Sequence, residues 1–336
     1  MEKGILNSSA DKKENKSFGS SSAKKKKRKQ AVTMHIRSFL PKGRNDAYAG
    51  TLWASKKQKK MALKINVPFE ELDLPENLYK YRLAHKEEHL RIITHQEFYF
   101  APPLPFSNHE FNLPTDYESI TKEDIFKKLY EDSLNIFKIQ NEKKRKQFAE
   151  YHLKTTNFFD KKFRTKADEL FRDRINEEFG IISMSPLKDN CSLWRDFTNF
   201  HSGFAVGLKP SFMFKKGIVA CTAGFVDYYK MEEQPKMKAF SKSLKEKLSN
   251  QMLNIFSLPD KFKDEQEYRL CKQTKISGRI LIANKECFSE FILGAFMDKE
   301  NRVKLIELIN SNFKEIPIFE QVINSSNCEM SFNKIQ

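Results

Sequence analysis

The feature that most constrains the fold of this chain is the separation of its charge from its apolar residues. Residues 1–64 contain 18 Lys and Arg but only 4 Asp and Glu, so they hold +14 of the net charge of +16. The remainder has 42 basic and 40 acidic residues and nearly all of the 30 Phe. A segment with high net charge and few apolar residues cannot bury enough surface to fold. We therefore expect a disordered basic leader over residues 1–65, with the function in the nearly neutral body behind it.

Six consecutive basic residues lie within this leader, from Lys24 to Lys29. Such a run has three interpretations: a nuclear import address read by import machinery, a non-specific arm for phosphate or anionic lipid, and a solvated tail. No aromatic residue interrupts the run, which disfavours stacking on single-stranded nucleic acid. Nucleic acid is therefore a possible but not a favoured partner.

The cysteines and the apolar stretches indicate the compartment. The 5 Cys residues are odd in number, widely spaced and without a C-x-x-C pair, which is typical of reduced thiols in a reducing compartment. The first residues lack the apolar core of a secretory signal, and the longest apolar stretch, residues 217–226, is about half of what a spanning helix needs. We expect a soluble intracellular protein with no membrane span.

Hydrophobic periodicity predicts an α+β fold with strands at both ends and helices in the middle. A capping box from Thr121 to Asp124 opens a helical segment over about residues 121–180, which we expect Gly180 to end. Further helices are expected at 84–93 and 300–313. Strands are expected at 77–82, 97–101, 181–185, 203–208, 217–222, 267–271 and 278–282. The predicted organisation is a leader over 1–65, one domain over 66–315 and a C-terminal tail over 316–336.

Three groups of residues are candidates for chemistry. His85-Lys-Glu-Glu88-His89 fits H-x-x-E-H, in which two histidines one helical turn apart bind zinc and the glutamate is the base. The alternative is a solvated amphipathic helix. Glu265 and Glu267 are two residues apart, so in extended chain their carboxylates lie on one side and either share a substrate or form a solvated edge.

The third group is Trp194 with His201, each of which suits either a ligand site or core packing.

Several motifs occur together in the order found in a widespread bacterial domain-of-unknown-function family. They are L-Y-K-Y-R at 78–82, I-S-M-S at 182–185, L-W at 193–194, H-S-G-F at 201–204, E-Q-E-Y-R at 265–269 and I-L-G at 292–294. Over about residues 76–312 the chain resembles this family, which is in turn similar to the mono-ADP-ribosyltransferases. Two motifs depart from the family pattern: F-N-D-P-F is represented by residues 106–111, and W-x-x-Y by Trp194 to Phe197.

The resemblance implies an ADP-ribosyltransferase-like split β-sheet core with a helical insertion, and NAD as a substrate. Glu267 would be the catalytic glutamate, and Glu265 the upstream carboxylate that marks arginine as acceptor. The residues expected to contact NAD are Arg82, Tyr81, Ser183, Ser185, Trp194 and His201.

These residues suit the chemistry of glycosidic cleavage. Loss of nicotinamide places positive charge on the ribose, and a fixed carboxylate stabilises that charge without a metal. The expected activity is mono-ADP-ribosylation of a protein, at arginine, by a host-directed bacterial effector or toxin. The alternatives are an NAD glycohydrolase with the same site, a basic-tailed nucleic-acid-binding module, and a zinc protease.

Overall fold

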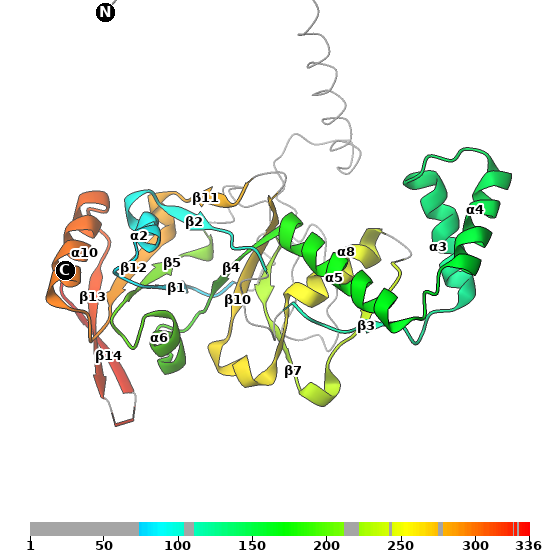
Figure 1. The fold of residues 1–336 in the computed structure, drawn as a ribbon. Coiled ribbons are helices and arrows are strands. Elements are labelled where there is room, and N and C mark those ends of the chain that lie inside the picture. The colour runs from blue at the N-terminus through cyan, green and yellow to red at the C-terminus, as the bar shows by residue number, and fades with distance from the viewer. Residues whose placement is uncertain are drawn as a thin grey trace, which may run out of the picture. The chain divides into compact units, whose positions relative to one another are not determined.

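The computed structural model describes residues 74–103, 111–211, 222–241, 244–274, 278–324, 326–327 and 329–336. Over these residues the fold is α+β, as predicted, with helices packed around mixed sheets (Figure 1). The predicted leader and its basic run, and most of the strand expected at 217–222, lie outside the described residues.

The largest sheet has the strand order β1-β5-β12-β13-β14. Its strands are β1 (Leu78–Arg82), β5 (Phe204–Leu208), β12 (Phe288–Leu293), β13 (Ile318–Asn324) and β14 (Glu329–Lys334). All neighbours are antiparallel except β12 and β13, which are parallel. β1 pairs with a strand that follows it by well over a hundred residues, Leu78 lying opposite Leu208.

A second sheet has the order β4-β10-β6 and is antiparallel throughout. Its strands are β4 (Phe179–Met184), β10 (Tyr268–Gln273) and β6 (Thr222–Phe225). The two sheets join at β1, where the amide of Tyr79 donates to the carbonyl of Ser185 at 2.7 Å and the amide of Ser185 donates back at 3.1 Å. This junction brings the beginning of the described chain beside β4.

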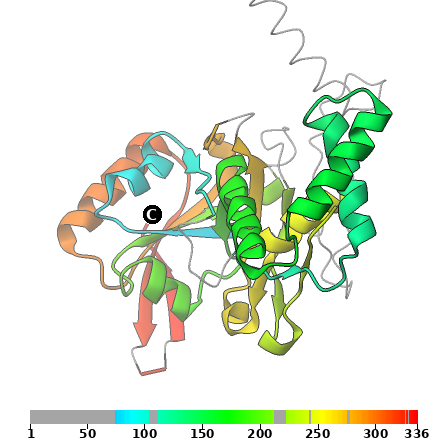
Figure 2. The same cartoon turned by 45° about the vertical axis from the view of Figure 1, so that its right-hand side comes forward.

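Helices cover the larger sheet on both faces (Figures 1 and 2). On one face α2 (Glu87–Thr94) and α10 (Lys299–Asn312) bury apolar residues such as Leu90, Ile93 and Leu305 in the main core. On the other face α6 (Cys191–Phe197) packs Leu193 and Trp194 against Tyr79 and Tyr81. Adjacent residues of β1 therefore enter different cores, as the period of two in a strand requires.

The helical middle consists of α3 (Lys122–Asn135), α4 (Glu142–Thr155) and α5 (Lys161–Glu178). The predicted capping box is confirmed, since Thr121 and Asp124 each satisfy the other's backbone amide. Asn141 caps α4 and Asp160 caps α5 through their side-chain oxygens. The apolar spacing continues across residues 121–180, but these caps divide the stretch into separate helices.

The remaining elements form short pairs and connections around the second sheet. They are β2 (Glu97–Tyr99) with β11 (Ile280–Ile282), β3 (Thr115–Asp116) with β8 (Met237–Lys238), β7 (Asp227–Tyr229) with β9 (Ser257–Pro259), the helix α8 (Leu244–Ile255), and the 3₁₀ turns η2 (Met231–Glu233), η3 (Asp260–Glu265) and η4 (Lys285–Cys287).

The predicted role of Gly180 as a helix stop is wrong. Gly180 is the second residue of β4, and the chain leaves α5 at Phe179 in an extended conformation. A Cβ on Gly180 would lie 2.6 Å from the Cβ of Phe100 and 2.9 Å from its carbonyl oxygen. Glycine is needed here because the backbone of Phe100 approaches closely. Helix ends also favour glycine, so the sequence alone does not distinguish the two causes.

The predicted C-terminal tail is also wrong. The helix expected to close the domain is α10, but β13 and β14 follow it and extend the larger sheet. Ile318 is fully buried and Gln321 almost so. A buried glutamine interrupts the apolar pattern, which explains why the sequence alone did not indicate a strand.

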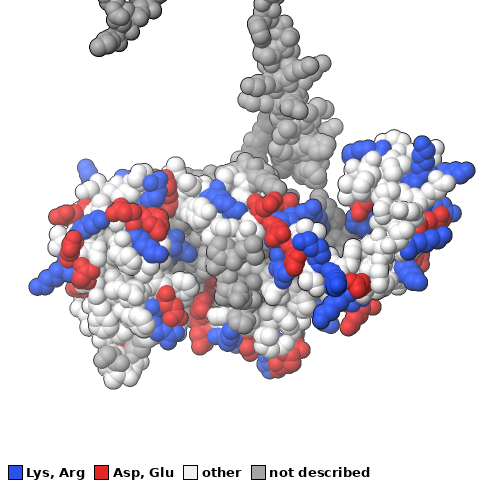
Figure 3. Space-filling view, viewed as in Figure 1, with Lys and Arg blue, Asp and Glu red and all other residues white. Residues whose placement is uncertain are grey.

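Charges of both signs are interspersed over the described part of the face seen in Figure 3, in keeping with the nearly neutral composition beyond residue 64. Among the described helices, none combines the length and the apolar character that crossing a membrane requires. Cys191 is disulfide-bonded, whereas Cys271 and Cys287 are free and buried. The expectation of reduced thiols throughout is therefore wrong for Cys191, because sequence spacing does not show which distant cysteines meet.

Candidate functional site at the junction of the two sheets

Two cations of β1 lie on one side of the strand. Lys80 and Arg82 alternate with Tyr79 and Tyr81, so the cations share one face and the tyrosines the other. Lys80 crosses the sheet junction, its Nζ donating to the carbonyl oxygen of Ser183 on β4 at 2.5 Å. In the part of the chain that the structure describes, no hydrogen bond or ion pair engages the Arg82 guanidinium. Among the described residues, Arg82 is therefore a cation without a matching anion at the junction.

The predicted catalytic glutamate lies directly before β10, in a nearly buried position. Glu267 is 4% exposed and receives two hydrogen bonds from Arg269, from Nε at 2.7 Å and from Nη2 at 2.8 Å. Its backbone amide donates to the hydroxyl oxygen of Tyr228 at 2.8 Å. Arg269 is held in turn by the carbonyl of Ile255 and lies over the ring of Phe111. The Glu267 carboxylate is thus fixed in one orientation, with a second lone pair left on each oxygen.

The electrostatics connect the cations to this carboxylate. Burial and the nearby Arg82 hold the pKa of Lys80 well below its usual value, and Glu267 opposes the shift. Burial and Arg82 also lower the pKa of His89 to about 4, so the ring is neutral and its Nδ1 accepts from the amide of Leu83 at 2.9 Å. Burial lowers the pKa of Arg82 to about 10, which leaves it charged at neutral pH. The junction carries a positive field that an anion would relieve.

The two carboxylates predicted to lie side by side are arranged differently from the expectation. Glu265 ends η3, and Gln266 has a φ of 44°, so the chain turns between Glu265 and Glu267 instead of running straight. The prediction of a common strand face is therefore wrong. Both carboxylates nevertheless raise the pKa of Tyr228, although burial is the main cause, so both lie within electrostatic range of that phenol.

The predicted serines have different surroundings. Ser185 is buried, donates its hydroxyl to the carbonyl of Glu265 at 2.7 Å and accepts from the amide of Leu187 at 3.1 Å. It ties the strand end to the turn before Glu267. Ser183 lies opposite Arg269 in the β4–β10 register and is partly exposed. Only Ser183 has a hydroxyl that no described residue engages.

Three other predicted NAD contacts lie in the core on the opposite face of β1. Tyr81 donates to the carbonyl of Leu187 at 2.5 Å and meets Trp194 edge to face. Trp194 is fully buried and stacks on His201, whose Nδ1 lies 3.0 Å from Oε1 of Gln321. The structure therefore separates Tyr81, Trp194 and His201 from the cations of β1.

The zinc hypothesis does not fit the local geometry. α2 begins at Glu87, so His85 precedes the helix and does not share a helical face with His89. Among the described residues, no group of three or more His, Cys, Asp and Glu is placed to hold a metal. His89 instead uses Nδ1 to cap the turn after β1.

Sequence reasoning missed Lys80, Tyr228 and Arg269. A signal for Lys80 existed, because it precedes Arg82 by two residues in a predicted strand and so must share its face. Arg269 follows Glu267 by the same spacing. No local pattern pointed to Tyr228, which approaches Glu267 from β7.

The site therefore combines two half-buried basic side chains with an oriented carboxylate and a neighbouring phenol, an arrangement suited to holding an anionic ligand beside a centre where positive charge develops. Comparisons of this chain with protein-family models, curated proteins and solved structures found no match.

Proposed function

We propose that this protein cleaves NAD and transfers its ADP-ribose to a protein, with arginine as the acceptor. The observation that carries the proposal is the placement of Lys80 and Arg82 on one face of β1, with Lys80 bonded across the junction to Ser183. Ser183 lies opposite Arg269, the ion-pair partner of Glu267. A dinucleotide presents a pyrophosphate and a ribose that becomes cationic, which need a cation pair and a carboxylate respectively. The likeness to mono-ADP-ribosyltransferases, in fold and in motifs, is part of the same proposal.

In this mechanism Lys80 and Arg82 bind the pyrophosphate. The bond between nicotinamide and C1′ of the ribose breaks with its electron pair leaving on nicotinamide, and Glu267 stabilises the cationic ribose. A guanidinium nitrogen of the acceptor then attacks C1′ and loses a proton to a carboxylate. Glu265, on the far side of the turn at Gln266, is the residue proposed to receive the acceptor.

The test uses biotinylated NAD with the purified full chain and a eukaryotic lysate. Glu267→Gln should reduce labelling by on the order of a hundredfold or more. Glu320→Gln is the matched control, because Glu320 forms a surface pair with Arg302 and the same chemical change is made away from the junction. Circular dichroism of both variants checks that they are folded.

The same reaction distinguishes transfer from hydrolysis. Glu267-dependent release of nicotinamide without labelled protein would identify an NAD glycohydrolase that uses water as the acceptor. If the folded wild-type chain produces neither labelled protein nor free nicotinamide, the NAD proposal is ruled out.

A further inference from the structure

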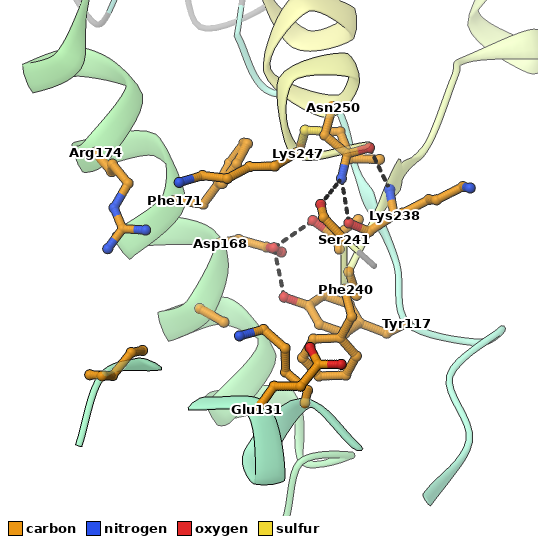
Figure 4. A pocket seen from close by; sticks show the side chains of 16 residues that line it. Tyr117, Glu131, Asp168, Phe171, Arg174, Lys238, Phe240, Ser241, Lys247 and Asn250 are labelled. Carbon is orange, nitrogen blue, oxygen red and sulfur yellow. Dashed lines mark hydrogen bonds between the residues drawn. The ribbon is translucent and has the colours of Figure 1, made fainter. Parts of the chain in front are cut away.

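A second site lies away from the sheet junction, in a cavity of about 550 Å³ between α3, α5, α8 and the β3–β8 pair (Figure 4). Cavities of this size hold small organic ligands in other proteins. Its apolar wall is formed by Ile136, Ala167, Phe171, Met237, Ala239 and Phe240. The cavity shares no lining residue with the junction that holds Lys80 and Glu267.

The walls of the cavity are held by specific polar contacts. Asn250 of α8 accepts from the amide of Lys238 at 3.1 Å and donates to its carbonyl at 2.7 Å, which fixes β8 against the helix. Asp168 of α5 accepts from the hydroxyls of Thr115 at 2.7 Å and Tyr117 at 2.8 Å. These contacts connect α5, α8 and the two short strands, so the space between them is built into the fold.

The lining contains four cations and two carboxylates. The ion-pair and hydrogen-bond partners of these groups show which charges are available to a ligand. Lys128 pairs with Asp132, and Lys238 pairs with Glu246, both acids outside the lining. The Asp168 carboxylate already accepts two hydroxyl hydrogen bonds, and Glu131 is exposed, as are Arg174 and Lys247. Two cations remain, Arg174 and Lys247, and among the described residues neither has an ion-pair or hydrogen-bond partner.

Arg174 and Lys247 approach the cavity from different helices. Ala167, Phe171 and Arg174 follow one another at helical spacing on α5, so they share the face that lines the cavity. Lys247 and Asn250 do the same on α8. In Figure 4 the Lys247 side chain extends past Phe171 towards α5, where Arg174 lies. Two cations and an aromatic ring thus line one side of the cavity.

We propose that this cavity binds a small organic anion with a flat apolar body. Its carboxylate or phosphate group lies between Arg174 and Lys247, and its body packs on Phe171. A guanidinium and an ammonium supply charge-assisted hydrogen bonds to either kind of oxyanion, and the aromatic and aliphatic wall removes the body from water.

The test uses two fluorescent probes with the same apolar body. 8-Anilinonaphthalene-1-sulfonate carries an anionic group, and N-phenyl-1-naphthylamine lacks it. The wild-type chain should bind the sulfonate saturably at one site. Arg174→Gln with Lys247→Gln should weaken sulfonate binding about tenfold and leave binding of the neutral probe within about twofold. Phe171→Ala should weaken both.

A control removes the same amount of charge elsewhere on α5. Lys161→Gln with Lys162→Gln alters two exposed cations that do not line the cavity and should leave sulfonate binding unchanged. An equal loss of binding in this control, or no loss in the Arg174 and Lys247 variant, would overturn the proposal. Competition by phenyl phosphate or by benzoate identifies the preferred oxyanion, and displacement by inorganic phosphate at the same concentration would overturn the role of the apolar wall.

Discussion

Glu267 and Arg269 form a two-point ion pair in which the arginine side chain is wholly buried and the glutamate side chain is 6% exposed. Removing one partner of a buried pair leaves an uncompensated charge in the interior. We predict that Glu267→Ala lowers the free energy of unfolding by about 3–5 kcal/mol. Urea denaturation at neutral pH measures this loss. The surface change Glu320→Ala should cost less than about 1 kcal/mol, and equal effects of the two changes would show that the Glu267 pair is not buried in solution.

His89 should make the protein less stable in mild acid. Its pKa is lowered to about 4 in the folded state, so between that value and its usual 6.5 the unfolded chain binds more protons than the folded one. Stability therefore falls as the pH falls through this window. His89→Asn keeps an acceptor for the Leu83 amide but does not titrate, so its unfolding free energy should fall less between pH 7 and pH 5.

His85→Asn is the control for this prediction, because the exposed His85 lies outside α2. In His85→Asn the unfolding free energy should change with pH as steeply as in the wild type. A His89→Asn variant whose slope matches that of wild type would contradict the assignment of the acid sensitivity to this ring.

Lys80 should strengthen NAD binding and make the affinity depend on pH. Lys80→Met removes one of the two cations proposed to hold the pyrophosphate and should weaken NAD binding about tenfold, as measured by isothermal titration calorimetry. Lys304→Met, at a surface pair with Glu87, should leave binding unchanged.

The lowered pKa of Lys80 also fixes the sign of two pH effects. NAD binding to the wild type should weaken as the pH rises through that pKa, because the ammonium loses its proton. Between the lowered pKa and 10.5 the unfolded chain binds more protons, so stability should rise with pH. Lys80→Met should flatten this rise, and an unchanged slope would contradict the burial of the ammonium.

Truncation after Glu315 should prevent folding. β13 pairs with β12, and its Ile318 belongs to the main core together with Phe291 and Phe313. Without β13 and β14 that core and the edge of β12 are exposed to water. We expect the truncated chain to be insoluble or to show no cooperative thermal transition. A soluble, cooperatively folding truncation would mean that residues 316–336 are the tail first expected.

Gly180→Ala should destabilise the protein by about 1–3 kcal/mol. The added methyl group meets the backbone of Phe100, which cannot move aside as a flexible side chain can. Thermal denaturation measures the loss. Gly278→Ala is a useful comparison, because no described atom lies within 4 Å of its Cβ position and only its φ of 68° opposes the change. An undiminished melting temperature in Gly180→Ala would refute the close approach.

Local pattern predicted the strands that now form β1, β4, β5 and β10 to within a few residues, because each alternates or clusters apolar residues between clear stops. It failed where a residue type has two uses. Glycine fits both a helix end and a close backbone approach, and only the latter applies at Gly180. Gln321 reads as solvent-facing, but it is buried because it meets His201 and the amide of Ala295.

The candidate site was predictable only where local sequence motifs identified its residues. Arg82 and Glu267 were identified from motifs, and the structure places Arg82 on the same face of β1 as Lys80 and Glu267 directly before β10. Tyr81 could not have joined Arg82, because neighbours in a strand face opposite sides. The approach of Tyr228 to Glu267, and the junction of Tyr79 with Ser185, depend on which distant strands meet. Sequence periodicity contains no information on that pairing.

The pairing of β1 with β5 has a consequence for synthesis. At about 5–20 residues per second on the ribosome, β1 emerges roughly 6–25 s before the strand that it pairs with in the larger sheet. During that interval the helical segment α3–α5 can form on its own local contacts, while the apolar face of β1 remains open to solvent and to chaperones. Lys80 and Arg82, which we propose bind the pyrophosphate, are therefore among the first of the described residues to be made, and the strand that pairs with theirs follows more than a hundred residues later.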